Sequence, residues 1–177
     1  VLTGVSASRT EKNAGTYGVT ASGTDTNYNL TFVDGALTIT KANATVTANS
    51  ATSTYSGVNQ TVSGFTASGL VGSETAAVLT GVSASRTEKN AGTYAVTASG
   101  TDTNYNLTFV DGALTIAKAN ATVTASSATS TYNGANQTVS GFTVSGLVGS
   151  ETAAVLTGVS ASRTEKNAGT YAVTASG

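Results

Sequence analysis

The stretch NYNLTFVDGALTI, Asn104–Ile116, carries the strongest secondary-structure signal in the chain. Apolar residues alternate with polar ones on both sides of the pair Asp111 and Gly112, which is the pattern of half-buried strands. Asp and Gly both tolerate the positive φ that a two-residue type I′ turn requires. The stretch therefore predicts a β-hairpin whose turn lies at Asp111 and Gly112.

The same alternation predicts which side chains this stretch contributes to a core. Side chains on a strand point to alternate faces, so one face of the first strand collects several large apolar groups. We expect them to share one core with apolar residues that precede them in the chain. The predicted core is Tyr105, Leu107, Phe109, Leu114 and Ile116, together with Tyr94, Val96, Phe65 and Leu70.

The stretch recurs at Asn27–Ile39 because the chain repeats itself every 77 residues. Residues 1–100 align with residues 78–177, and 94 of these 100 pairs are identical. A unit of this length exceeds a solenoid repeat and can bury a small core of its own. We therefore predict the C-terminal part of a module at 1–40, a whole module at 41–117 and the N-terminal part of the next at 118–177, all within a longer array.

The rest of the 41–117 module is also predicted to form short strands. Alternation predicts strands at 43–48, 82–86 and 93–98, and extended segments near 53–55 and 62–70. GSETAAVLTG, at 72–81, contains helix formers after Ser73, a residue that favours helix N-caps. The predicted fold is mostly β, with β-grasp-like or sandwich-like small modules that each carry one short helical turn, in a linear tandem array.

Composition excludes several classes of function. Charged residues make up 10% of the chain, against about 25% in ordinary soluble domains. The eight basic residues are spread singly, so no basic stripe could neutralise nucleic-acid phosphates. The apolar runs are far shorter than the roughly 18–20 residues that span a bilayer. We predict no nucleic-acid partner and no membrane insertion, and the absence of cysteine means that burial alone must hold each module.

Catalysis is also not expected. The chain has no His and no Cys, which excludes Ser-His and Cys-His nucleophiles and the common zinc sites. Paired carboxylates remain in each period, but most of them fall in predicted turns, where solvation is the usual state. These are Glu74, Glu88, Asp102 and Asp111. We predict that the protein is not an enzyme and has no catalytic, cofactor-binding or metal-binding residues.

Two short motifs match known functional sites, but each also has a simpler structural interpretation. DTNYN, at Asp25 and again at Asp102, begins like a calcium loop but lacks the following Gly and the twelfth-position Glu. A polar turn is the favoured reading. N-x-T triplets, at Asn29, Asn43 and Asn59, match the glycosylation acceptor. They are expected by chance in a chain this rich in Asn and Thr.

Two further motifs are weaker. A Lys–Asn isopeptide crosslink would need Lys41, Asn104 and Glu74 to be buried together, whereas charged side chains are rarely buried without a partner. The alternating Thr45 and Thr47 could suggest an ice-binding face, but one such pair per repeat is too sparse for a regular lattice. Alternating Thr is ordinary on exposed strands.

The join between modules is short. The predicted strand Ala36–Thr40 runs through Lys41 and Ala42 directly into the predicted strand at 43–48. A Gly/Ser-rich linker would allow free reorientation, whereas two connecting residues leave only a few dihedral angles. The sequence therefore predicts a stiff, elongated rod.

The order of motifs within the period resembles that of a known kind of repeat. KAxATVTA, TYxGxNQ, SGLVGSETAAVLTG, KNAGTYAVTASG and NYNLTFVDGALTI follow one another across the whole unit. This order resembles the MBG and YDG type repeats of bacterial exoproteins, which occur in tandem in filamentous-haemagglutinin-like adhesins and biofilm-matrix proteins. The resemblance implies a β-rich, grasp-like module used as a stalk or fibre segment outside the cell, with no catalytic or binding residues.

These observations leave one leading function and two alternatives. We expect a structural repeat region that forms the stiff stalk or fibre of a bacterial surface adhesin or matrix protein, secreted or at the cell surface. Its partners would be other copies of the same repeat. The first alternative is a self-associating extracellular filament subunit, because Thr-rich strands with open edges favour association. The second is a glycan-binding module that stacks sugars on Tyr94, Tyr105 or Tyr55.

Overall fold

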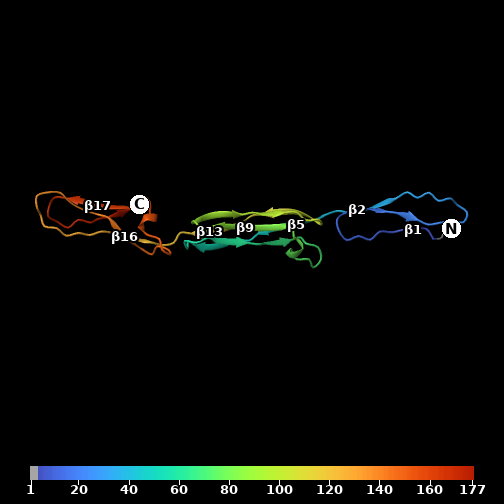
Figure 1. Cartoon of the computed structure of the whole chain (residues 1–177), viewed down its shortest axis with the longest axis horizontal. Coiled ribbons are helices and arrows are strands. Elements are labelled where there is room, and N and C mark those ends of the chain that lie inside the picture. The colour runs from blue at the N-terminus through green and yellow to red at the C-terminus, as the bar shows by residue number, and fades with distance from the viewer. Residues whose placement is uncertain (1–3) are drawn as a thin grey trace. The chain divides into compact units, whose positions relative to one another are not determined.

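A computed structural model describes residues 4–177 as short β-strands with two 3-10 helical turns (Figure 1). The prediction of mostly β modules with a short helical turn is confirmed. We call residues 1–40, 41–117 and 118–177 the first, second and third repeats. The helical turns, η1 (Ala76–Val78) and η2 (Ala153–Val155), occupy the same place in the second and third repeats.

The second repeat contains nine of the eighteen strands in the described residues. Its sheets have the orders β12-β5-β8, β11-β9-β7 and β10-β13-β6. The predicted strands at 43–48 and 82–86 are confirmed, and the one at 93–98 is interrupted at Thr97. The strands are β5 (Ala42–Ala48), β6 (Ala51–Thr54), β7 (Gln60–Ser63), β8 (Phe65–Ser68), β9 (Val82–Glu88), β10 (Gly92–Val96), β11 (Ala98–Gly100), β12 (Tyr105–Val110) and β13 (Gly112–Ala117).

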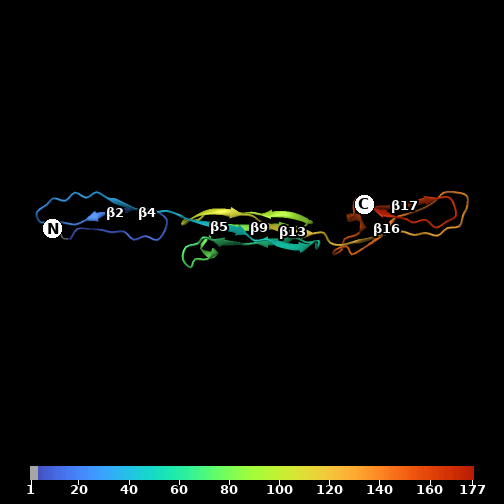
Figure 2. The ribbon, with the colours of Figure 1, turned by 180° about the vertical axis from the view of Figure 1, so that it is seen from behind.

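The first and third repeats contain fewer strands, and three of their four described sheets have only two strands. The first has β1 (Ser6–Ala7), β2 (Gly15–Val19), β3 (Ala21–Ser22) and β4 (Gly35–Ile39). The antiparallel pair β2-β4 is visible in Figure 2. The third has β14 (Thr122–Ala125), β15 (Gln137–Ser140), β16 (Phe142–Ser145), β17 (Ser160–Glu165) and β18 (Ala175–Ser176), in sheets β14-β16 and β15-β17-β18.

The chain divides into two compact units that do not follow the repeat. The first unit takes the described residues up to Ala51 together with Thr61–Arg86 and Tyr94–Leu114. The second takes Thr52–Gln60, Thr87–Thr93 and Thr115–Gly177. Each unit therefore combines residues from two repeats.

The predicted hairpin at Asp111 and Gly112 is wrong. β12 pairs in parallel with β5, with Tyr105 opposite Ala42, whereas β13 joins a different sheet. Gly112 is not among the glycines with positive φ. A Cβ on it would lie 2.3 Å from the carbonyl oxygen of Asn49, so glycine is needed here for close backbone approach rather than for a turn.

The core of the second repeat is partly the one expected. Val96, Tyr105, Leu114 and Ile116 are buried, as predicted. Phe109 is 36% exposed and lies in an edge strand of its sheet. Tyr94, Phe65, Leu70 and Leu107 are also only half-buried. The remaining buried apolar side chains in this repeat are Ala44, Val46, Ala48, Val62, Leu79, Val82, Ala84 and Ala98.

The helical turn begins later than predicted. Its N-cap is Thr75 in an extended conformation, without a side-chain hydrogen bond, and not Ser73. Three residues form the whole turn, so few free N–H groups need a cap. Leu79 follows directly and is 2% exposed, which makes this segment part of the core.

One stretch of sequence has two structures in this chain. Residues 24–33 and 101–110 are identical, yet only the second copy forms a strand. Tyr105 is 4% exposed in β12, whereas Tyr28, its counterpart, is 68% exposed. Among the described residues, 28–33 have no neighbouring strand, whereas 105–110 lie along β5. The parallel neighbour, and not local propensity, makes this stretch a strand.

The close approach at Gly112 gives a testable prediction. We expect Gly112→Ala to lower the free energy of unfolding by about 1–3 kcal/mol, because the new Cβ would overlap the carbonyl oxygens of Ala48 and Asn49. Urea unfolding of the 177-residue chain measures this loss.

The first repeat supplies the matched control. Gly35 has the same local sequence, but its nearest neighbour would be 3.9 Å from a new Cβ. Gly35→Ala should therefore change the stability by less than about 0.5 kcal/mol. Equal losses for the two variants would show that the backbone approach at Gly112 is not what selects glycine.

Candidate functional site: the junctions between repeats

The described residues contain no group of three or more acidic, His or Cys side chains able to hold a metal ion. No helix in that part of the chain is long and apolar enough to cross a membrane. Side-chain hydrogen bonds of Asn104 and Tyr55 join one repeat to the next, so the two junctions are the candidate functional sites.

At the first junction, the connection between β4 and β5 is bound to the second repeat. The Nζ of Lys41 donates a hydrogen bond to the carbonyl oxygen of Asp102 at 2.6 Å. The next residue, Ala42, donates its N–H to the carbonyl oxygen of Asn104 at 2.9 Å. The connecting segment is thus held against the turn at 102–104.

That turn is built by the carboxylate of Asp102. Its Oδ1 accepts the backbone N–H of Asn104 at 2.7 Å and that of Tyr105 at 3.1 Å. Asp25 accepts the N–H of Asn27 in the same way at 2.8 Å. These are side-chain turns in which an Asp replaces a backbone acceptor. Both DTNYN motifs therefore form polar turns, the reading that we favoured over a calcium loop.

Asn104 reaches back to the first repeat. Its Oδ1 accepts the backbone N–H of Ala14 at 2.8 Å, and its Nδ2 donates to the Oδ1 of Asn13 at 3.2 Å. The two partners lie 90 and 91 positions earlier in the chain. A backbone donor of one repeat is thus satisfied by a side chain of the next, which ties the orientation of both groups together.

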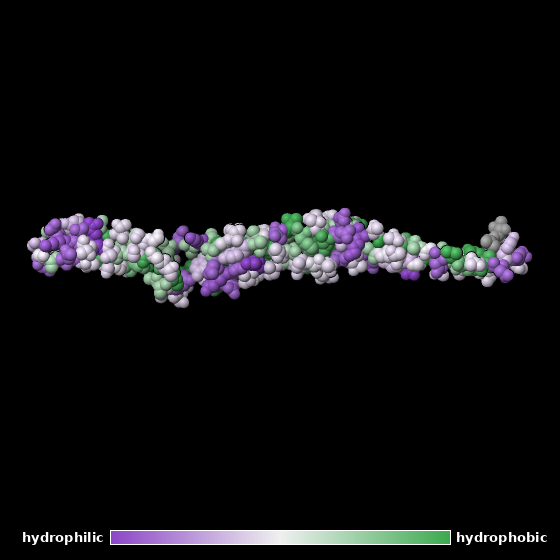
Figure 3. Space-filling view, turned by 90° about the horizontal axis from the view of Figure 1, so that it is seen from above, coloured by the Kyte–Doolittle hydropathy of each residue, from purple (hydrophilic) through white to green (hydrophobic). Residues whose placement is uncertain are grey.

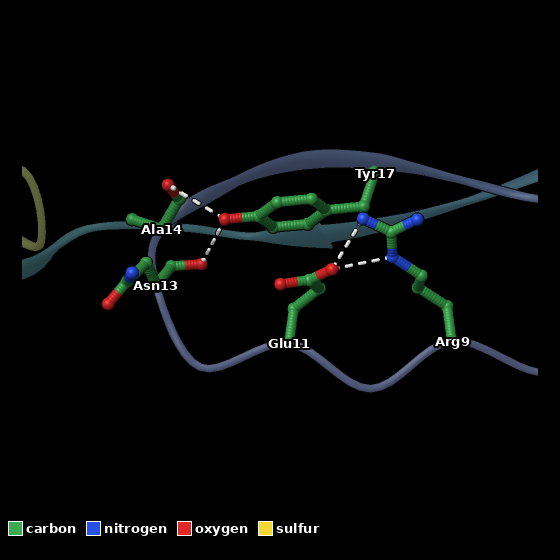
Figure 4. A network of polar contacts seen from close by, with 5 residues as sticks. All are labelled: Arg9, Glu11, Asn13, Ala14 and Tyr17. Carbon is green, nitrogen blue, oxygen red and sulfur yellow. Dashed lines mark hydrogen bonds and ion pairs between the residues drawn. The ribbon is translucent and has the colours of Figure 1, made fainter.

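A small network holds Asn13 and Ala14 in place for this contact (Figure 4). The hydroxyl of Tyr17 donates to the carbonyl oxygen of Asn13 at 2.9 Å, with the carbonyl oxygen of Ala14 at 3.5 Å. The guanidinium of Arg9 lies 5.5 Å from the centre of the Tyr17 ring and pairs with Glu11 at 2.5 Å. The ring is thereby fixed between the loop backbone and a cation.

The stack of Arg on Tyr occurs in all three repeats. The pairs Arg9–Tyr17, Arg86–Tyr94 and Arg163–Tyr171 have separations of 5.5, 5.5 and 5.6 Å. The stack is thus a feature of each repeat. Because Arg86 covers one face of the Tyr94 ring, that face is not free for a sugar.

The second junction uses a tyrosine and a glutamate. Tyr55 in the second repeat donates its hydroxyl to the Oε1 of Glu151 in the third. The backbone N–H of Tyr55 donates to the carbonyl oxygen of Ala117 at 2.8 Å, at the end of the second repeat. The bond to Glu151 raises the pKa of Tyr55 above its ordinary value, and desolvation adds to the rise.

Within the second repeat, the counterpart of Glu151 has a different partner. Glu74 accepts the hydroxyl of Tyr105 on its Oε2, and this hydroxyl oxygen accepts the N–H of Val71 at 2.9 Å. The bond to Glu74 raises the pKa of Tyr105, although the Val71 N–H opposes the rise. Of the two equivalent glutamates, Glu74 therefore accepts a tyrosine hydroxyl of its own repeat, and Glu151 accepts one of the preceding repeat.

Of the three residues considered for an isopeptide crosslink, Lys41 and Asn104 both lie at the first junction, but each of the three bonds a different group. Lys41 bonds Asp102, Asn104 bonds the first repeat, and Glu74 bonds Tyr105. Sequence reasoning missed the partners of Asn104 and Glu74. The 77-residue identity alone cannot tell whether a side chain bonds its own repeat or a neighbour.

Comparison with protein-family models gives two matches. The model described as MBG domain (YGX type) matches residues 44–115 and 121–177. A second model, described as MBG domain, matches residues 3–43. No curated protein and no solved structure matches the chain.

The contact between Asn104 and Ala14 gives a prediction for the first junction. Asn104→Ala removes the acceptor of the Ala14 N–H, so this amide should exchange with solvent about five to ten times faster, as for a hydrogen bond of about 1 kcal/mol. Hydrogen exchange followed by NMR measures the rate. Asn27→Ala, in the same sequence context, is the control and should leave it unchanged. An unchanged exchange rate of the Ala14 amide in Asn104→Ala would show that this contact does not form at the junction.

The raised pKa of Tyr105 gives a prediction for alkaline solution. Because the folded pKa lies above the ordinary 10.0, its stabilising effect is complete below about pH 10 and is lost as the pH rises through the folded value. The unfolding free energy should therefore fall as the pH rises above about 10. Tyr105→Phe should reduce this fall, whereas Tyr28→Phe should not. Equal falls in all three proteins would contradict the assignment.

Proposed function

This chain belongs to the MBG domain (YGX type) family, and we propose that it serves as a structural repeat region outside the cell. In this proposal it forms a stiff stalk or fibre segment of a bacterial surface adhesin or matrix protein, secreted or held at the cell surface. Length and stiffness are then the properties under selection, and no residue carries chemistry.

The observation that carries the proposal is the construction of the first junction. Only Thr40 and Lys41 separate β4 from β5, and Lys41 bonds the turn of the second repeat. Asn104 adds a bond to the backbone of the first repeat. A flexible linker would let adjacent repeats reorient freely, whereas these contacts restrict their orientation. Both sides of the junction belong to one compact unit, which supports transmission of stiffness along the array.

The character of the surface fits the same role. Figure 3 shows residues of intermediate hydropathy over much of the visible face, with polar and apolar residues in small patches. The net charge is −1, so long-range attraction of charged partners is weak. Such a surface suits a spacer that holds something else at a distance.

Self-association is the second candidate, and a specific observation favours it. In the second repeat, β12 and β8 are the edge strands of their sheet, and Val58 and Val71 are 64% and 60% exposed. Nothing comparable favours glycan binding. Of its three tyrosines, Tyr105 is 4% exposed, Tyr94 is stacked under Arg86, and Tyr55 is bonded to Glu151.

Small-angle X-ray scattering tests the stalk proposal. Chains of increasing repeat number should show a maximum dimension that grows linearly with each added 77-residue repeat. A flexible string of domains would grow approximately as the square root of that number. The matched control has a Gly-Ser insertion between Thr40 and Lys41 and at every equivalent junction, and it should lose the linear growth. The proposal fails if the unaltered chain behaves like the control.

A further inference from the structure

We propose that the second repeat is a mechanical clamp, in which the parallel pair β5-β12 resists tension applied along the chain. This function rests on the proposed stalk, because a stalk that holds an adhesive part is pulled along its length. It adds tensile strength to the length and stiffness already proposed. The clamp depends only on the pairing within the repeat and on the points where the chain enters and leaves that repeat.

The chain enters the repeat through β5. Only Thr40 and Lys41 lie between β4 and this strand, so tension from the first repeat pulls directly on the N-terminal end of β5. The first residue of the strand, Ala42, donates its N–H to the carbonyl oxygen of Asn104 at 2.9 Å. The load on the entering chain therefore acts at once on the contact between β5 and the start of β12.

The chain leaves the repeat through β12 and β13. Only Asp111 separates these two strands, and Lys118 follows β13 directly. Tension from the third repeat therefore reaches β12 through β13 and pulls on the C-terminal end of β12.

These two pulling points lie at opposite ends of the pair, because β5 and β12 are parallel. Their register runs from Tyr105 opposite Ala42 to Val110 opposite Thr47. Tension draws β5 toward its N-terminus and β12 toward its C-terminus, so the strands must slide past each other. The hydrogen bonds of a parallel pair are evenly spaced along the strands, so they share this load. An antiparallel pair would be pulled at one end only, and its bonds would break one after another.

The strands that continue from this pair have the same arrangement. β6 lies beside β13. The N–H of Ala113 donates to the Oγ of Ser50 at 3.0 Å, and the N–H of Tyr55 donates to the carbonyl oxygen of Ala117 at 2.8 Å. The partners advance along the chain in the same direction, so β6 and β13 are also parallel. Tension loads this second pair in the same sense as the first.

Side chains on the β5-β12 pair also oppose sliding. Asn106 donates its Nδ2 to the Oδ1 of Asn43 at 3.3 Å across the two strands. Val46 lies opposite Phe109 and has no exposed surface. A shift of the register by one residue would move each side chain to the opposite face. The clamp therefore combines shared backbone bonds with the burial of Val46.

Single-molecule pulling with optical tweezers tests the direction of the load. The chain has no cysteine, so two introduced cysteines can carry DNA handles at chosen points. Thr40→Cys with Lys118→Cys pulls across the whole repeat and shears the pair. Thr40→Cys with Thr103→Cys pulls at one end of the same pair and separates its strands from that end. All three positions are exposed, so both variants should keep the urea midpoint of the unaltered chain.

We expect the shearing variant to unfold at a force at least about twice that of the other variant, because six residue pairs carry the load together. Both variants are pulled at the same loading rate. An equal or lower force in the shearing variant would overturn the clamp. It would leave the stalk function untouched, because the scattering experiment measures length without load.

Two matched truncations locate the resistance within the repeat. Val46→Ala alters β5, whereas Val62→Ala makes the same change in β7, which belongs to the separate sheet β11-β9-β7. Both side chains are buried, so each variant should have a lower urea midpoint. At constant force in the shearing geometry, Val46→Ala should raise the unfolding rate at least about fivefold and Val62→Ala less than about twofold, because only β5 is pulled free at the barrier. Unfolding rates that follow the urea midpoints in both variants would refute the clamp.

Discussion

The parallel pairing of β5 with β12 is the constraint on which the second repeat depends. Its partners are 63 residues apart in sequence, so the strands β6 to β11 and the helical turn all lie within the segment that this pairing closes. Burial depends on it as well. Val46 lies opposite Phe109 of β12 and has no exposed surface. Five large side chains are fully buried in the described chain, and all of them belong to the repeat that has this pairing: Leu79, Leu114, Ile116, Val46 and Val96.

Local elements could be predicted from the sequence, and their partners could not. The strands at 43–48 and 82–86 follow from alternation because that pattern depends only on near neighbours. The prediction of a hairpin at Asp111 and Gly112 was wrong. The same residues also suit an extended chain that continues past a close backbone contact at Gly112. The identical stretches at 24–33 and 101–110 show directly the limit of prediction from local sequence, since the second contains a strand and the first does not.

The junction contacts were beyond prediction for a related reason. Asn104 and Glu74 occur once in every period, and their bonds go to Ala14 and Tyr105, which also recur. An exact repeat gives no information on which copy supplies a partner. What could be predicted was the shortness of the join, because Lys41 and Ala42 follow Thr40 without a linker. The interactions across it are directional hydrogen bonds, which fix orientation more than they add stability. Coupling of this nearest-neighbour kind is how repeat arrays extend order along a chain.

The position of β12 near the end of the repeat also orders events in time. A chain that emerges N-terminus first, from a ribosome or through a pore, presents β5 long before β12. Until β12 arrives, β5 keeps one edge free and its repeat stays open. Each repeat would thus complete its folding only when the last segment had appeared, so that folding would advance along the array one repeat behind the emerging chain. During synthesis of successive repeats, only a single repeat would therefore be unfinished at any moment.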